Sequence, residues 1–199
     1  MPAILYAGPT SPFARMARVV SLELDIRVEE RVIDVYTAEF LDALNPLRQI
    51  PTLVTEAGVP VYDSRVICRY FDAISGKETL IPDERRWEIE TRWALAVGVM
   101  ESGLQRRMEM LRPAAEQSPA TIAKLEIRID RALAQLEREV GAFRGAGTRM
   151  DCVATGVALE YTDFRYTSEW RQRCPQLHGW LDGFARRPSM IQTRPRDPN

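Results

Sequence analysis

Two long stripes of apolar residues in the second half of the chain limit its fold most strongly. Between residues 84 and 112, apolar side chains recur every three or four positions, and Pro113 ends the pattern. A second stripe of this kind runs from Ile122 to Phe143. Each stripe is one face of an amphipathic helix, which is stable when that face is buried against a neighbour. Two further helices are expected at about 151–166 and after Pro175, so this half of the chain is predicted to be a helical bundle.

The first 77 residues have a different pattern, in which short apolar runs alternate with helical stripes. The runs 3–7 and 28–33 predict two strands, and 51–55 with 59–62 predict a hairpin around Gly58. Helical stretches are expected at about 13–24, 38–44 and 64–74. An order that ends in a hairpin predicts a mixed sheet with helices on its faces. We therefore predict an α/β domain over residues 1–77, a linker over 78–83 and an all-helical domain over 84–199.

Charge and hydropathy exclude several classes of protein. Twenty-seven Lys and Arg residues against 28 Asp and Glu residues give a net charge of −1, which argues against a nucleic-acid-binding protein. No apolar run approaches the roughly 18–20 residues needed to span a bilayer. The first residues carry no basic segment, and Pro9 and Pro12 interrupt them, so they make a poor signal peptide. A cytoplasmic protein that binds neither nucleic acid nor membrane is expected.

The cysteines and the single histidine exclude more. Cys68, Cys152 and Cys174 are far apart and odd in number, which supports neither a disulfide framework nor a structural zinc site. His178 is the only histidine and has no nucleophile signature near it, so we interpret it as structural. No metal site is expected.

Three segments of the first domain are candidates for chemistry. Ser11 precedes Pro12 at a helix start, where it either caps the helix or, with the helix dipole, helps to hold an anion. Pro51 opens a strand and is a candidate for a cis peptide bond. Asp63 and Ser64 open a helix, and either can cap it or bind a charged ligand. Taken singly, each segment is explained by structure alone.

Taken together, the segments resemble a known family. S-P-F at 11–13, N-P-L-x-x-I-P-x-L at 45–53 and D-S-x-x-I at 63–67, followed by an all-helical half, are similar to the cytosolic glutathione S-transferases. The stretches 98–104, 112–118 and 161–165 resemble one bacterial subgroup of serine-type members. The resemblance covers essentially the whole chain. It implies a thioredoxin-like N-terminal domain, which binds glutathione as co-substrate, and an all-α C-terminal bundle.

The family's roles can be carried over to matching positions. Ser11 is the implied catalytic residue, facing the thiol of glutathione, with Phe13 beside it. Ile50, before the implied cis-proline Pro51, would pair its backbone with the cysteinyl part of the tripeptide. The γ-glutamyl end would meet Asp63 and Ser64, and the glycyl end would meet Arg48 and Gln49.

In the helical half, the 100–111 face would hold the electrophile, and Glu101 would reach a neighbouring subunit's γ-glutamyl amine.

Two departures from the family pattern bear on these roles. Ser11 stands where other members have a cysteine, which argues against thiol exchange by the enzyme, and Tyr6 is a rival donor to the thiol. The family's capping box would fall on Arg149 and Cys152, neither of which suits it. Thr148 and Asp151 make a similar pair one residue earlier, so either a local deletion has shifted the cap to them or this helix starts differently from the family's.

The expected function is activation of the glutathione thiol for attack on a small apolar electrophile, in detoxification. Glutathione-dependent peroxidase or dehalogenase activity would use the same site. The alternative is a non-catalytic protein of this fold that acts in stress response through protein partners. A homodimer is expected, with Met100, Met108 and Met110 of the long helix near its interface.

Overall fold

The computed structural model describes residues 2–197, so the outer ends of both expected domains, residue 1 and residues 198–199, lie outside it. The chain divides into two compact units: the first contains the residues up to Leu80 and those from Pro188 on, and the second contains Ile81–Arg187. The expected helical domain ran to residue 199. The structure instead places Pro188 onward with the first unit, because a short helix there packs on the first helix of the chain. No helix within residues 2–197 is both long and apolar enough to cross a membrane.

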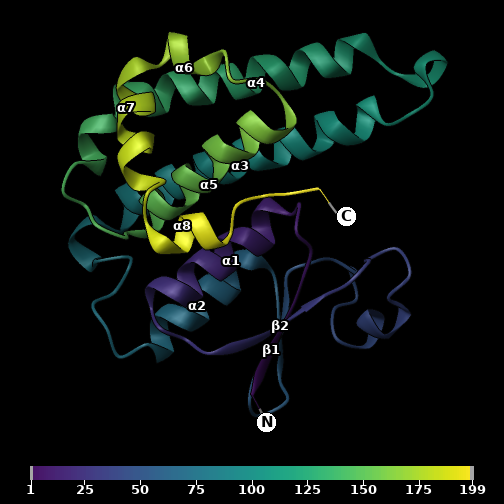
Figure 1. The fold of residues 1–199 in the computed structure, drawn as a ribbon, viewed down its shortest axis with the longest axis vertical. Helices are drawn as coiled ribbons and strands as arrows, with labels where there is room; N and C mark the ends of the chain where they lie inside the picture. The colour runs from purple at the N-terminus through teal and green to yellow at the C-terminus, as the bar shows by residue number, and fades with distance from the viewer. Residues whose placement is uncertain (1, 198–199) are drawn as a thin grey trace. The chain divides into compact units, whose positions relative to one another are not determined.

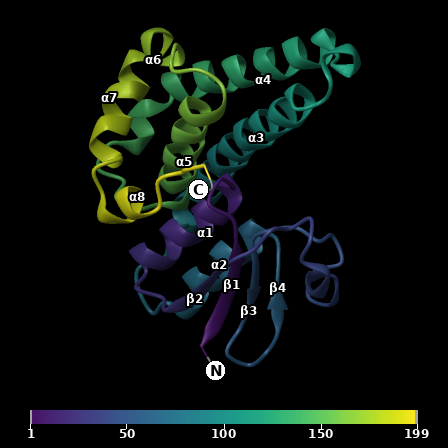
Figure 2. The same cartoon turned by 45° about the vertical axis from the view of Figure 1, so that its right-hand side comes forward.

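The first unit is built on a four-stranded mixed sheet of order β2-β1-β3-β4 (Figure 2). β1 pairs parallel with β2, antiparallel with β3, and β3 pairs antiparallel with β4. The strands are β1 (Ala3–Ala7), β2 (Val28–Val32), β3 (Thr52–Val54) and β4 (Pro60–Val61). The predicted fold class is therefore confirmed. The strands of the hairpin are shorter than predicted, since Pro51 and Thr55 fall outside them.

Both faces of this sheet are covered. On one face, the side chains of Leu5, Ala7 and Leu53 are fully buried. Helices α1 (Pro12–Glu23) and α2 (Ser64–Ile74) pack side by side in this unit (Figure 2). Tyr6 points to the other side, because successive side chains alternate along a strand. It forms a small core with Ala38 and Leu41 of the segment that includes the 3-10 helix η1 (Glu39–Ala43).

The second unit is a bundle around three long helices: α3 (Arg86–Met110), α4 (Pro119–Arg138) and α5 (Met150–Arg165), with α3 packed on both others. Figure 1 follows them from teal to green. The predicted burial of α5 is confirmed, because Asp151–Leu159 are all buried. The second apolar stripe is interrupted, since α4 ends at Arg138 and a 3-10 helix, η4 (Val140–Phe143), follows. The short elements are η2 (Asp83–Arg85), η3 (Ala114–Glu116), α6 (Trp170–Arg173) and α7 (Pro175–Phe184).

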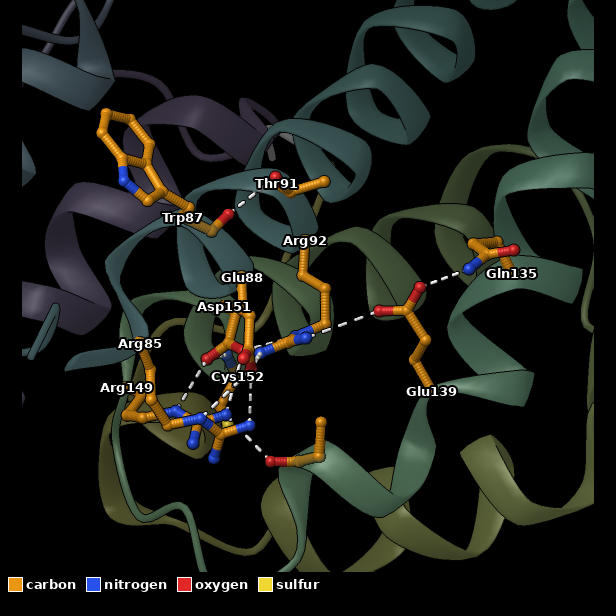
Figure 3. A network of polar contacts seen from close by, with 11 residues as sticks. Arg85, Trp87, Glu88, Thr91, Arg92, Gln135, Glu139, Arg149, Asp151 and Cys152 are labelled. Atoms are coloured by element: carbon orange, nitrogen blue, oxygen red, sulfur yellow. Dashed lines mark hydrogen bonds and ion pairs between the residues drawn. The ribbon is translucent and has the colours of Figure 1, made fainter.

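A buried carboxylate joins the helices of the second unit (Figure 3). Asp151 is fully buried and accepts a hydrogen bond from Arg92 of α3 at 2.8 Å and another from Arg149 at 3.0 Å. Arg92 also lies 3.5 Å from Glu139, at the end of α4. Asp151 is thus the charge on which three segments converge.

Of the two alternatives for this helix, the structure supports the second: the helix starts differently from the family's, and Thr148 and Asp151 do not cap it. Arg149, not Thr148, is the N-cap of α5, and it makes no side-chain capping bond. Asp151 accepts from the backbone N–H of its neighbour Cys152, at 3.1 Å, and otherwise serves the two arginines. The Asp151 carboxylate accepts from the guanidinium of Arg149, whereas in a capping box it would accept from the backbone N–H of the N-cap residue.

Candidate functional site

The sheet topology brings the three candidate segments to one end of the sheet. β1 and β4 run in the same direction and β3 runs against them. The residues that follow β1, precede β3 and follow β4 therefore lie at the same end of the strands. These residues, 8–11, 48–51 and 62–64, include the candidates singled out in the sequence: Ser11, Pro51, Asp63 and Ser64.

One contact fixes two of these segments to each other. The pairing of Tyr6 with Thr52 places Gly8 opposite Ile50 when the register is continued by two residues. The approach is close, since a Cβ on Gly8 would lie 2.8 Å from Ile50 Cδ1. Gly8, which directly follows β1, is thus a site residue whose role the sequence interpretation missed.

Ser11 is the N-cap of α1. Its Oγ accepts from the Ala14 backbone N–H at 3.2 Å, and Pro12 occupies the first helical position. Within residues 2–197 the Ser11 hydroxyl has no acceptor for its own proton. The capping bond uses an oxygen lone pair, so the hydroxyl can cap the helix and donate to a ligand at once. Phe13 follows in the first turn and is half-buried.

The rival donor Tyr6 lies in a different place. Its ring is 8% exposed and packs against Phe40, with 5.2 Å between ring centroids. Tyr6 is paired with Arg31 of β2 in the sheet; Glu29, and to a lesser extent Tyr6, raise the pKa of that arginine. Tyr6 therefore serves the core beneath the sheet, and its surroundings favour Ser11 as the donor.

The segment before β3 presents an unpaired backbone. The Ile50–Pro51 peptide bond is cis, as predicted, and Pro51 is buried. Neither the N–H nor the C=O of Ile50 makes a backbone hydrogen bond to any of residues 2–197. An unpaired donor and acceptor beside a sheet can take an extended peptide as an added strand.

Asn45 holds this backbone in place. It is 2% exposed, and its Nδ2 donates to the Gln49 carbonyl at 3.1 Å and to Thr52 Oγ1 at 3.0 Å. Thr52 Oγ1 in turn donates to the Gln49 carbonyl at 2.8 Å. The bonds bracket Ile50 and Pro51 from both sides. In the sequence Asn45 stands out only as part of the N-P-L-x-x-I-P-x-L motif, and no local signal shows that its side chain is buried against Gln49 and Thr52.

Arg48 and Gln49 differ in their surroundings. The Arg48 guanidinium binds Asp42 through two bonds, Nε to Oδ1 at 2.5 Å and Nη2 to Oδ2. This pairing raises the pKa of Arg48 and lowers the pKa of Asp42. Gln49 is exposed. Arg48 is therefore committed to a partner of its own, whereas the Gln49 side chain faces solvent.

The start of α2 separates the roles of Asp63 and Ser64. Asp63 is the N-cap, and its Oδ1 accepts from Arg65 N at 2.9 Å and Val66 N at 3.4 Å. Ser64 is 4% exposed, and its hydroxyl has no hydrogen-bond partner among residues 2–197. Of the two candidates, Asp63 is therefore the residue that caps α2. Ser64 offers a hydroxyl beside the positive end of the α2 dipole, which suits an anion.

The predicted residues of the second unit have mixed positions. Met100 is fully buried in the monomer, so it belongs to the core and not to an outer face. Met108 and Met110 are exposed, as is Glu101. His178 packs edge-on against Trp170 and lies 3.5 Å from Asp182, which fits a structural residue. Across residues 2–197 no group of three or more His, Cys, Asp or Glu side chains forms a metal site.

Comparison with known proteins gives a consistent result. Residues 10–74 match the family model described as "Glutathione S-transferase, N-terminal domain". The uncharacterized GST-like protein YibF of Escherichia coli K12 is 30% identical over 197 residues, covering 96% of this chain and 98% of that protein.

Two solved structures are also similar along nearly their whole length. A glutathione transferase family member from Pseudomonas fluorescens Pf-5, with bound glutathione, has a TM-score of 0.93 and 35% identity, covering 98% of this chain and 100% of that one. A glutathione S-transferase from Methylobacillus flagellatus, with glutathione bound, has a TM-score of 0.92 and 30% identity, with the same coverage.

Proposed function

Because the chain belongs to the glutathione S-transferase family, we propose that it binds glutathione at the end of its sheet and activates the thiol for attack on a small apolar electrophile. The observation that supports this proposal most is that hydrogen-bonding groups without a partner lie together at one end of the sheet. Ser11 has a free proton, Ile50 has a free backbone N–H and C=O, and Ser64 has a free hydroxyl, within residues 2–197.

Each group matches one part of the tripeptide. The Ile50 backbone pairs with the cysteinyl residue like an added strand. The Ser64 hydroxyl donates to the γ-glutamyl carboxylate, and Asp63, whose Oδ1 already caps α2, offers Oδ2 to the γ-glutamyl ammonium. Gln49, exposed before the cis bond, is placed for the glycyl end. Arg48 supports this segment through its ion pair with Asp42.

Ser11 acts on the thiol as a hydrogen-bond donor. A free thiol of this kind has a pKa of about 8.5, and only the thiolate is a good nucleophile. Lowering that pKa by about 2 units takes about 2.7 kcal/mol of preferential interaction with the anion. One charge-assisted bond from the Ser11 hydroxyl and the dipole of α1 are together of this size. The thiolate then bonds to the electrophilic carbon, and the leaving group departs or the adduct takes up a proton.

We further propose a homodimer. The second unit has a groove of about 790 Å³ along α3 and α4, floored by small residues such as Ala94 and Gly98. The first unit exposes Val59, Tyr62 and Val66 around β4 and the start of α2. A second copy would cover such apolar surface. Light scattering at micromolar concentration is expected to give the mass of two chains, and the mass of one chain would refute the dimer.

Calorimetry with glutathione, followed by a broad electrophile screen, tests the function. Binding at millimolar glutathione or below, with turnover of at least one electrophile, is expected. Absence of binding would overturn the proposal and favour a non-catalytic protein that acts through protein partners. Turnover of a hydroperoxide or a haloalkane would assign peroxidase or dehalogenase chemistry to the same thiolate.

A further inference from the structure

Arg15 is a buried cation in the first turns of the helix that Ser11 caps. It is 3% exposed and lies four residues after Ser11. A guanidinium stays charged in proteins and needs acceptors when it is buried. Arg15 Nε donates to Thr193 Oγ1 at 3.3 Å, and Nη2 donates to the Met190 carbonyl at 3.2 Å. Both acceptors belong to the last residues of the chain.

The C-terminal segment that supplies these acceptors is itself fixed along α1. Its helix α8 (Pro188–Gln192) lies beside α1 (Figure 1). Thr193 is 1% exposed and donates its hydroxyl proton to the Ser189 carbonyl at 2.7 Å, which leaves an oxygen lone pair for Arg15. The Ser189 hydroxyl donates to the carboxylate of Glu23, the last residue of α1. The segment is therefore attached near both ends of α1.

The backbone of Arg15 closes the turn that Ser11 starts. Its N–H donates to the Ser11 carbonyl at 3.0 Å, next to the bond from Ala14 N–H to Ser11 Oγ. Arg15 thus bonds the C-terminal segment through its side chain and the turn that carries the Ser11 hydroxyl through its backbone. We propose that residues 188–193 position Ser11, with Arg15 as the positioning residue through which they act. This rests on the role proposed for Ser11.

A matched pair of substitutions isolates the effect. Thr193→Val removes the hydroxyl that receives Arg15 and keeps the shape of the side chain. Thr162→Val is the control: Thr162 is also buried, and its hydroxyl donates to the carbonyl four residues earlier, Ala158, at 2.9 Å. The control lies in the second unit, on α5, and has no bond to α1. Thr193→Ser restores the hydroxyl and should restore wild-type behaviour.

The first measurement is hydrogen exchange at the Ala14 and Arg15 amides in ligand-free protein. Thr193→Val is expected to speed exchange there by about tenfold or more, because a buried hydrogen bond from a charged group is lost. Thr162→Val and Thr193→Ser should leave both amides as in wild type. Unchanged exchange in Thr193→Val would overturn the proposal without any reference to glutathione.

The second measurement is the pH titration of the bound glutathione thiol by its thiolate absorbance. Thr193→Val should raise the thiol pKa by less than Ser11→Ala does, and the double variant should match Ser11→Ala alone. If Ser11→Ala shifts the titration and Thr193→Val does not, the positioning role fails and the proposed function stands. If Ser11→Ala causes no shift, the proposed role of Ser11 fails, and the exchange experiment alone decides whether the segment orders the turn.

Discussion

Gly8 touches the side chain of Ile50 so closely that a Cβ on Gly8 would lie 2.8 Å from Ile50 Cδ1. The contact joins the loop before Ser11 to the segment that carries the cis bond, two segments about 40 residues apart in the sequence. Because Gly8 does not have a left-handed φ, an alanine there is opposed by the contact and not by the backbone. Because glycine has no Cβ, these two proposed parts of the glutathione site can lie this close together.

Gly8→Ala should push Ile50 Cδ1, the flexible end of that side chain, out of its place, which should lower the free energy of unfolding by about 0.5–1.5 kcal/mol and weaken glutathione binding a few-fold. The double variant with Ile50→Val, which lacks the clashing Cδ1, should recover most of both losses. Calorimetry and denaturant unfolding measure the two quantities. Gly179→Ala is the control, since nothing lies within 4 Å of a Cβ there. Full affinity in Gly8→Ala would show that the contact does not set the spacing.

Ser64→Ala should separate binding from stability. Asp63 caps α2, so loss of the Ser64 hydroxyl should change the free energy of unfolding by only a few tenths of a kcal/mol. Glutathione affinity should fall about tenfold or more, because a charge-assisted bond to the γ-glutamyl carboxylate is lost. Asp63→Asn keeps a capping side chain and removes the charge that meets the ammonium. It should also lower affinity at nearly constant stability; unaltered affinity in both variants would contradict these assignments.

Asp151→Asn should destabilise the second unit strongly. It removes the charge that pairs the buried Arg92 and the half-buried Arg149 and leaves Arg92 with Glu139 at 3.5 Å; breaking a buried pair typically costs about 3–5 kcal/mol, and we expect a loss near the lower end of that range. Asp163→Asn is a matched control, since that carboxylate is part-exposed and its pairing with Arg171 should contribute less. Denaturant unfolding compares the two. A smaller loss in Asp151→Asn than in Asp163→Asn would disprove the central role of Asp151.

The three thiols should be inert in the folded protein. Burial raises the pKa of Cys68, and burial together with Asp151 raises the pKa of Cys152 to about 12. Cys174 is also buried, which raises its pKa. Iodoacetamide at pH 8 should label all three in urea and none, on the same timescale, in native protein. Rapid labelling of the native protein would show that these thiols are accessible.

The raised pKa values of the buried thiols also predict how the free energy of unfolding changes with pH. The unfolded thiols ionise near their ordinary pKa of about 8.5, whereas the folded ones stay protonated. The unfolded state then binds fewer protons, so the free energy of unfolding should fall as the pH rises above about 8.5. The contribution of Cys152 should continue to fall until the pH reaches about 12, the pKa of its thiol in the folded protein. Replacing Cys152 with Ala should flatten this part of the profile, and an equally steep decline would contradict the assignment.

Local signals predicted much of this fold. The bounds of α2, Ser64–Ile74, follow from the N-cap Asp63 just before the helix, the apolar stripe within it and Ser75-Gly76 just after it. The segments of the site were found because turn and cap residues mark them. What sequence reasoning missed depends on residues that meet only after folding.

The Pro188–Gln192 helix is too short to show a stripe, and its place on α1 depends on Arg15, which lies at the other end of the chain. Asp151 looked like a cap because its partner Arg92 is 59 positions away. Gly8 and Asn45 were both visible as residue types, yet their roles depend on what faces them: Ile50 for one, Gln49 and Thr52 for the other.

The most direct test of the central claim is the absorbance of thiolate in bound glutathione, followed against pH in wild type and Ser11→Ala. If the Ser11 hydroxyl stabilises the anion, the variant should bind glutathione with nearly unchanged affinity at low pH. The apparent pKa of its bound thiol should rise, and turnover near neutral pH should fall about 10–100-fold, as loss of one charge-assisted bond predicts. Loss of the cap should cost about 0.5–2 kcal/mol of stability as well, which denaturant unfolding separates from the titration. Superimposable titration curves for the two proteins would contradict the account and remove Ser11 from the mechanism.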